Sequence, residues 1–346
     1  MGKSAICVTG LVRGEELGVT LPHEHLLIEF SCRYSPAADE AELGPQPRLA
    51  DRWKLLRQPA GYRVNLIGTS IDSAVEECSH FIAAGGRTIV DLTPRGAGDD
   101  PVGLRRIAEM TGLNVIASTG YYIDAALPEW VRTASVTQLA DRLVSDVQTG
   151  GSEGVRRGAI GEIAVEGPTE LELRCVRAAG QAQARTGAPV FLHVMSGILP
   201  AYRDSTAEVI ELYRREGGDL RRLVLCHQDG SGDDPNYQAA LLERGIWLEY
   251  DTFGSEGVFA FGEIYIQLPT DSQRIGELAA LIKAGFQSQL LISQDVCYQT
   301  GKRSWGGWGL AHILDTLKPR FAAGGIATSV FDSLMRDNPR ALFAFA

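Results

Sequence analysis

The chain has 346 residues, of which 45% are hydrophobic and 22% charged, and its formal net charge at pH 7 is −10. This is the balance of a globular protein with a sizeable core. The acidic charge argues against nucleic acid and anionic membrane surfaces as partners, because both attract basic proteins. No apolar run approaches the roughly 18 residues of a membrane span, so no segment is expected to cross a membrane.

The cysteine pattern indicates the cellular compartment. Six cysteines are scattered along the chain without a Cys-x-x-Cys pair: Cys7, Cys32, Cys78, Cys175, Cys226 and Cys297. This spacing predicts reduced thiols in a cytoplasmic protein and not a disulfide framework. The first residues, MGKSAICVTG, lack a basic segment followed by a long apolar run, so no secretory signal is expected.

Short apolar runs alternate with helical patterns along the chain. Eight runs are predicted to be strands, over residues 21–30, 87–94, 114–122, 158–167, 188–195, 222–230, 245–254 and 290–297. Helical periodicity covers residues 70–86, 169–187, 206–218, 236–245 and 272–285. Eight strand–helix units in a chain of this length predict an α/β protein with a (β/α)8 TIM barrel. We find no repeat or linker, so residues 1–346 are predicted to form a single domain.

Two segments break this alternation. Residues 31–69 follow the first predicted strand, and residues 252–271, which are rich in aromatic side chains, follow the seventh. Segments that follow barrel strands lie on the face where the active sites of TIM barrels form. We therefore expect both inserts to border the site.

Polar side chains stand near the ends of five predicted strands. They are His23, His25, Glu162, His193, His227 and Asp295. Each lies in an apolar run, where a polar group is costly unless it is paired or bound to metal. Because strand residues alternate between faces, His23 and His25 point the same way and Glu24 points the opposite way. The same alternation predicts that Cys226, beside His227, turns away from the site and serves packing.

Histidine and carboxylate ligands suit zinc, and also manganese, cobalt or iron. Six ligands exceed the needs of one tetrahedral ion, so the set predicts two divalent ions, most readily zinc, that share a bridging carboxylate and a bridging hydroxide. Taken alone, His193 is more typical of a hydrogen-bonded core histidine, and the interpretation depends on all six residues meeting at one end. His80 and His312 lie in helix-like segments and are expected to be structural.

The order of these residues resembles the amidohydrolase superfamily and, more narrowly, the phosphotriesterase family. The resemblance is carried by GVTLPHEHLLIEF, ASTGYY, GEIAVEG, FLHV, LCHQDG, EYDTFG and SQDV, between residues 18 and 297, and by the tail MRDNPRALFAF at 335–345. It implies that His23, His25 and Asp295 hold the more buried metal and that His193 and His227 hold the second. It also implies that Asp295 is the general base that takes a proton from the bridging hydroxide.

Two departures place the chain within the family. The organophosphate-degrading and lactonase members bridge their metals with a modified lysine, where this chain has Glu162, which resembles the glutamate-bridged phosphotriesterase-related and phosphotriesterase homology proteins. Glu166, on the same strand face, is the alternative bridge. Asp251 is followed by Thr252 and Phe253, where quorum-quenching lactonases have an arginine. Together these departures argue against acyl-homoserine lactonase activity.

Candidate substrate-binding residues follow from the same resemblance and from the loops after strands 7 and 8. They are Tyr122, Phe253, Tyr298, Arg303 and Trp305. Tyr122 matches the position where the lactonases keep a tyrosine beside the metals, although a packed aromatic is nearly as good an interpretation. Lys302 and Arg303 either meet an anionic group of the substrate or form a solvated surface pair. The tryptophans of this loop suit a pocket wall or a dimer contact.

The function predicted from the sequence is that of a binuclear metal-dependent hydrolase. Its bridging hydroxide is expected to attack a small ester, lactone or N-acyl amide. The alternatives are a phosphotriester hydrolase, a non-catalytic ligand-binding protein on the same scaffold, and a mononuclear deaminase of the same superfamily. The expected partner is a small-molecule substrate, and the family implies a homodimer.

Overall fold

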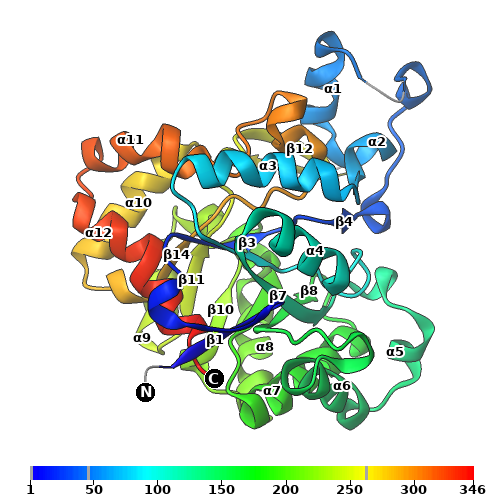
Figure 1. Cartoon of the computed structure of the whole chain (residues 1–346), viewed down its shortest axis with the longest axis vertical. Helices are drawn as coiled ribbons and strands as arrows, with labels where there is room; N and C mark the ends of the chain where they lie inside the picture. The colour runs from blue at the N-terminus through cyan, green and yellow to red at the C-terminus, as the bar shows by residue number, and fades with distance from the viewer. Residues whose placement is uncertain (1–2, 45–46, 262–263) are drawn as a thin grey trace.

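The computed structural model describes residues 3–44, 47–261 and 264–346, and an eight-stranded parallel sheet stands at its centre (Figure 1). The strands are β3 (Thr20–Glu24), β6 (Thr88–Asp91), β7 (Asn114–Tyr121), β8 (Ala159–Val165), β9 (Val190–Val194), β10 (Leu223–Leu225), β11 (Trp247–Tyr250) and β14 (Leu290–Ile292). Neighbouring strands in the sheet follow one another along the chain, and all the pairs are parallel. The predicted (β/α)8 barrel is therefore confirmed.

Helices surround this sheet. The longer ones are α3 (Ile71–Ala83), α4 (Pro101–Thr111), α6 (Val136–Gln148), α7 (Glu170–Thr186), α8 (Arg203–Arg215), α9 (Pro235–Glu243) and α10 (Asp271–Lys283). Shorter helices are α5 (Glu129–Thr133), α11 (Lys318–Ala323), α12 (Thr328–Asp332) and α13 (Asn338–Phe343). Capping boxes, such as Thr169 with Glu172, fix where several begin. Among the described residues, no helix is long and apolar enough to cross a membrane.

Apolar side chains fill the barrel at the amino ends of its strands. Val90, Phe191 and Leu291 belong to this inner cluster. The end is covered by the antiparallel pair β1 (Ser4–Cys7) and β2 (Gly10–Arg13) and by α13, whose Phe343 stacks on Phe191 at 5.8 Å between ring centroids. The packing leaves the carboxyl ends of the strands as the place where polar side chains gather.

The two strands at the ends of the sheet order, β3 and β14, are joined mainly through side chains. The carboxylate of Glu24 accepts hydrogen bonds from Ser293 Oγ at 2.8 Å, from the Gln294 amide at 3.0 Å and from the Val296 amide at 3.0 Å. Ser293 Oγ also lies 2.8 Å from the His23 carbonyl, so its one hydrogen is shared between the two acceptors, and it accepts a hydrogen bond from the His23 amide at 3.2 Å. Glu24 therefore faces away from the neighbouring histidines and closes the barrel.

Both inserts stand over the carboxyl ends of the strands (Figure 1). The first contains α1 (Arg52–Arg57), α2 (Arg63–Leu66) and β5 (Ile67–Gly68), which pairs with β4 (Ile28–Glu29). The second contains the antiparallel hairpin of β12 (Gly257–Phe261) and β13 (Ile264–Leu268). In Figure 1, α1, α2 and β12 lie at the same end of the molecule, as the sequence leads us to expect.

A buried arginine on α10 anchors the start of the second insert. Arg274 donates to Asp229 Oδ2 at 2.7 Å, to Asp271 Oδ1 at 3.1 Å, to Thr252 Oγ1 at 2.6 Å and to the Ser255 carbonyl at 2.8 Å. These charge-assisted bonds satisfy most of its five donors without solvent. The loop that follows β11 is therefore held firmly before it reaches the hairpin.

Glu277, on the same helix, gives a prediction for the pH dependence of stability. Burial, and then the charge of Asp229, raise its pKa from 4.5 to about 7. Because the folded chain binds this proton more tightly than the unfolded chain, the free energy of unfolding falls as pH rises through this range. Glu277→Gln should therefore stabilise the protein at pH 8 by about 1–2 kcal/mol, allowing for partial solvent exposure, and by almost nothing at pH 4.

Urea unfolding of both proteins at pH 4, 6 and 8 measures this difference. Glu208→Gln, which removes an equal charge from an exposed position on α8, is the matched control. A gain for Glu277→Gln that is the same at all three pH values would contradict the prediction.

Candidate metal centre and substrate cavity

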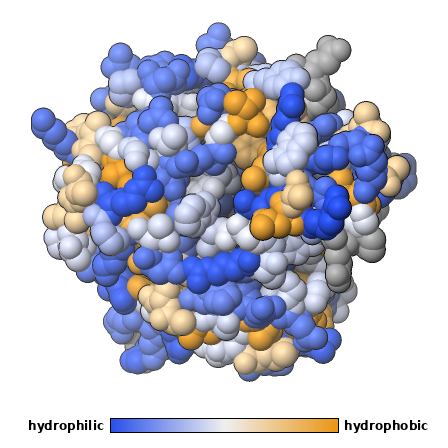
Figure 2. Space-filling model, turned by 90° about the horizontal axis from the view of Figure 1, so that it is seen from above, coloured by the Kyte–Doolittle hydropathy of each residue, from blue (hydrophilic) through white to orange (hydrophobic). Residues whose placement is uncertain are grey.

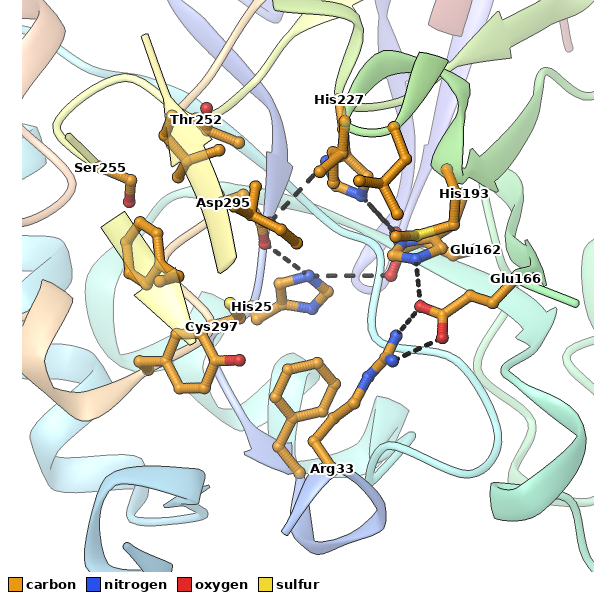
Figure 3. A pocket seen from close by; sticks show the side chains of 18 of the residues that line it. His25, Arg33, Glu162, Glu166, His193, His227, Thr252, Ser255, Asp295 and Cys297 are labelled. Carbon is orange, nitrogen blue, oxygen red and sulfur yellow. Dashed lines mark hydrogen bonds and ion pairs between the residues drawn. The ribbon is translucent and has the colours of Figure 1, made fainter. Parts of the chain in front are cut away.

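The four predicted histidine ligands meet around the carboxylate of Glu162. Figure 3 shows three of them, His25, His193 and His227, beside this carboxylate. Its Oε1 is 3.2 Å from His193 Nδ1 and 3.6 Å from both His23 Nε2 and His227 Nε2. Its Oε2 is 4.0 Å from His25 Nε2. One carboxylate thus faces four histidines from three strands or their ends, which is the position that a bridging ligand needs.

Asp295, the sixth residue, approaches the cluster from the loop after β14. Its Oδ1 lies 3.1 Å from His25 Nε2 and 3.9 Å from His23 Nε2, and its Oδ2 lies 4.0 Å from His227 Nδ1. Asp295 and His227 are non-glycine residues with positive φ values of 47° and 59°. Such backbone costs on the order of 1 kcal/mol or more and concentrates at functional sites.

The residues present fit a metal centre. His23 Nε2 and Asp295 Oδ1 are buried, and neither has a hydrogen-bond partner among the described residues. Two groups of ligand atoms, from His23, His25 and Glu162 and from Glu162, His193 and His227, each lie within 4.8 Å of one another. Because the two groups share Glu162, the arrangement can hold metal, and a cation would satisfy the two unpaired atoms.

The electrostatics keep the carboxylates ionised. Burial acts to raise the pKa of Glu162, but hydrogen bonds from His193 and His227 and the nearby imidazoles outweigh it and hold the pKa well below its usual range. For Asp295, burial is likewise outweighed, here by the neighbouring His25 and then by the charges of the other imidazoles, so its pKa is lowered. Both groups are therefore available as anionic ligands.

Each histidine of the cluster has one ring nitrogen fixed by a partner outside it. The pairs are His23 Nδ1 with Glu249 Oε2 at 2.8 Å, His25 Nδ1 with Thr93 Oγ1 at 2.9 Å, His227 Nδ1 with Asp251 Oδ1 at 2.9 Å and His193 Nε2 with Glu166 Oε1 at 3.0 Å. Such partners set the tautomer and the ring orientation of a metal ligand. Sequence reasoning did not assign the roles of Glu249, Asp251 and Thr93, although the Glu-Tyr-Asp spacing places both acids on one strand face.

We expect Glu249→Gln to weaken metal binding by about 10- to 100-fold, because an amide holds His23 Nδ1–H less firmly than a carboxylate. Competition with a chelator of known affinity measures the change. The exposed Glu243→Gln on α9 makes the same charge change and should leave the affinity unaltered. An unchanged affinity in Glu249→Gln would show that His23 needs no fixed partner.

Glu166, the alternative bridge, has a different position from Glu162. It accepts hydrogen bonds from Arg33 and contacts only one histidine of the cluster, His193. Arg33 Nε and Nη2 also donate to the Tyr122 hydroxyl, at 3.1 and 2.6 Å. The geometry therefore favours Glu162 as the bridge and makes Glu166 the link between Arg33 and His193.

The predicted orientation of Cys226 is wrong, whereas its predicted role in packing is confirmed. Its side chain packs in the inner apolar cluster of the barrel, and its sulfur lies within 4.8 Å of ligand atoms of His23, Glu249 and Asp251. Strand β10 ends at Leu225 and His227 has left-handed backbone, so the alternation of faces does not continue across these residues. Cys226 and His227 therefore both face the interior.

A cavity of about 310 Å³ opens from the cluster. Apart from the ligands, Arg33 and Glu166, its walls are largely apolar and include Phe30, Ile198 and Leu199. Figure 2 looks onto the end of the molecule that carries the inserts, where the surface is hollowed near the middle of the view. The second insert contributes Phe259 and Ile266, which are paired across its hairpin.

The predicted substrate-binding residues separate into two groups. Tyr122 and Tyr298 line this cavity. Phe253, Arg303 and Trp305 do not: Phe253 packs on Phe321 in the core, Arg303 pairs with Asp315, and Trp305 packs beside α1. Lys302, the neighbour of Arg303, is buried, and burial lowers its pKa. These positions lie in loops, where sequence patterns fix orientation least.

The fold and this cluster define a barrel enzyme whose centre suits metal-assisted hydrolysis. The model of the phosphotriesterase family matches residues 4–343. The chain belongs to the phosphotriesterase family.

Relatives and solved structures agree with this assignment. The N-acetyltaurine hydrolases of Danio rerio and Homo sapiens are 34% and 32% identical, and each alignment covers 98% of this chain and 97% of the relative. A resiniferatoxin-binding protein from Rhodobacter sphaeroides superposes with a TM-score of 0.92 at 34% identity, covering 99% of this chain and 95% of that one. The phosphotriesterase homology protein of Escherichia coli, solved with phosphate in its active site, gives a TM-score of 0.76 at 26% identity, covering 95% and 99%. The chain is a hydrolase.

Proposed function

We propose that the protein is a binuclear metal-dependent hydrolase of N-acyl amides, with carboxylic esters and lactones as alternative acyl substrates. The observation that carries the proposal is the pair of ligand groups that share Glu162 and open into a cavity with apolar walls. The names of the N-acetyltaurine hydrolases support an amide over an ester. Cytoplasmic location and a homodimer remain part of the proposal from the sequence.

The predicted ligands would divide between two ions in this proposal. His23, His25 and Asp295 would hold one ion, His193 and His227 would hold the other, and Glu162 is available to both. Zinc suits this donor set, as do manganese, cobalt and iron. When bound, such ions polarise a carbonyl oxygen and lower the pKa of water to about 7.

The chain's own groups supply the remaining chemistry. The Asp295 carboxylate, which lines the cavity beside the predicted ligands, accepts the proton of the attacking water and passes it to the leaving nitrogen. The Tyr122 hydroxyl accepts hydrogen bonds from Arg33, so its own hydrogen is oriented to donate to the substrate. Phe30, Ile198 and Leu199 exclude bulk water around the reacting bond.

A hydrolysis screen tests the proposal. Protein loaded with zinc or manganese is incubated with N-acyl amino acids, N-acyl aminosulfonates, aryl esters, lactones and phosphotriesters, and the released products are quantified. We expect turnover of N-acyl amides at about two metal equivalents per chain. Turnover of phosphotriesters alone, or one metal equivalent with deamination, would contradict the proposed reaction.

A second candidate is a ligand-binding protein without turnover. The apolar cavity and the name of the Rhodobacter sphaeroides structure favour it. The two functions differ in their need for metal, because binding to an apolar wall requires no ligand cluster. Two results together would establish this second function. The metal-free protein would bind apolar esters, and the metal-loaded protein would hydrolyse none of the screened compounds.

A further inference from the structure

A second cavity, of about 210 Å³, adjoins the first at Asp295. The two cavities share a wall formed by Ser255, Phe259, Asp295, Cys297 and Tyr298. The second is bounded by α1 of the first insert, by the start of the second insert and by the loop after β14. Figure 3 shows Ser255 on one side of Asp295 and His193 with Glu166 on the other. If the bond to be hydrolysed lies beside Asp295, the two parts of the substrate that it joins extend into different cavities.

Gln294, in the wall of the second cavity, has a hydrogen-bond donor without a partner. Its Oε1 accepts from the Ile313 amide at 3.0 Å, which fixes the orientation of the side-chain amide. Its Nε2 is buried and has no partner among the described residues, and the whole residue is 2% exposed. A buried donor left unpaired costs about 1–3 kcal/mol. Because Gln294 lines this cavity, an acceptor atom of a molecule bound there can satisfy the donor.

Arg52 brings a positive charge to the same cavity. Its Nε donates to the Trp305 carbonyl at 3.1 Å and its Nη2 to the Thr300 carbonyl at 3.3 Å. Within residues 3–44, 47–261 and 264–346, no carboxylate lies within 4.0 Å of its nitrogens, whereas Arg33 in the first cavity is paired with Glu166. The guanidinium that is free to meet an anion is therefore in the second cavity.

The second cavity also carries acidic groups. Glu256 lines it, with its Oε1 accepting a hydrogen bond from the Asp271 amide at 2.7 Å, and Asp295 lies at the junction of the two cavities. A cation, an unpaired amide donor and two carboxylates in one small space complement a molecule that carries an acid group and an amine. The first cavity, with apolar walls, complements an acyl group.

We propose that the second cavity binds the leaving group of the substrate, a small amine that bears a carboxylate or a sulfonate. The acid group faces Gln294 Nε2 and Arg52, and the nitrogen released by hydrolysis lies beside Asp295 and Glu256. The acyl group occupies the first cavity. This inference rests on the proposed amide hydrolysis, and it assigns the selectivity for the leaving group to Gln294 and Arg52.

A matched set of substrates tests the assignment. N-acetyl-β-alanine and N-acetyltaurine carry a carboxylate and a sulfonate at the same position, and N-acetyl-β-alaninamide is a neutral equivalent of the first. We expect the wild-type protein to prefer the anionic amides. The ratio of kcat/KM for anionic over neutral amide should fall at least tenfold in Arg52→Met and in Gln294→Glu, mainly through KM, and Arg52→Lys should recover part of it.

Arg57→Met is the matched control, because it removes the same charge from an exposed position on α1 and should keep the wild-type ratio. Calorimetric titration with taurine and with β-alanine measures product binding without turnover. Comparison of the two anionic amides shows which acid group the cavity prefers.

The outcomes separate the inference from the proposed function. If the wild type hydrolyses these amides but Arg52→Met keeps the wild-type ratio and product affinity, the inference is wrong and the proposed function stands. If the wild type hydrolyses neither these amides nor any compound of the hydrolysis screen but binds taurine or β-alanine in a manner that needs Arg52, the cavity is a binding site and the proposed function fails. A lack of both hydrolysis and product binding contradicts both.

Discussion

Replacing Asp295 by asparagine lowers kcat for the preferred acyl substrate by an expected factor of about 10³–10⁴. A general base contributes roughly 10²–10⁴ to a rate, and an amide cannot accept the proton. Asp295 Oδ1 is also a candidate ligand, 3.1 Å from His25 Nε2 and 3.9 Å from His23 Nε2. Part of the loss therefore comes from weaker metal binding.

Steady-state kinetics with metal analysis of the same samples separates these two contributions. A variant that keeps two metal equivalents and loses activity identifies Asp295 as the base, and a variant that loses one equivalent identifies it chiefly as a ligand. Asp315→Asn, which removes a charge from a surface ion pair, is the control. Wild-type activity in Asp295→Asn would exclude both roles.

Glu24→Ala is expected to lower the free energy of unfolding by about 3–5 kcal/mol. The substitution leaves the buried amides of Gln294 and Val296 without their acceptor, and each unpaired group costs about 1–3 kcal/mol. It also removes one of the two acceptors near the Ser293 hydroxyl and opens a small void.

Urea denaturation of the metal-free protein measures this loss apart from any effect of metal. Glu24→Gln keeps one carbonyl oxygen for these donors, so its cost should be smaller, about 1–2 kcal/mol. Glu15→Ala truncates an exposed glutamate and should change stability by less than about 0.5 kcal/mol. If Glu24→Ala proves as stable as Glu15→Ala, the carboxylate does not hold the barrel closed.

Much of the site could be predicted because, in a parallel barrel, residues at the carboxyl ends of all the strands meet at one end of the molecule. A polar residue near the end of a parallel strand meets those of the other strands whatever the distance along the chain, so His23 and Asp295, 272 positions apart, come within 3.9 Å. The spacing of His23 and His25 fixes a common face through the two-residue period of a strand. These inferences need only local periods and the order of elements.

The remaining features of the site depend on irregular backbone, which has no sequence period. His227 and Asp295 have left-handed conformations that a strand pattern does not predict. The orientation of Cys226, next to His227, was predicted wrongly for this reason. Phe253 packs in the core and reaches only the second cavity, whereas Phe259, six residues later on the hairpin, lines both cavities, because the path of a loop decides which aromatic side chain faces the metal centre. The partners Arg33 and Arg52 come from an insert whose course is set by tertiary contacts.

The closure of the barrel through Glu24 has a consequence for the dynamics of the site. Amide protons that bond to a side chain depend on the order of that side chain, so exchange with solvent deuterium at Gln294 and Val296 should be faster than at the paired amides of β7 and β8. His23 and His25 lie on one side of the junction between β3 and β14, and Asp295 lies on the other. Local opening of this junction therefore separates the candidate ligands while the other strands stay paired. Glu24, which holds this junction closed, thus helps to set how long the metal centre stays assembled.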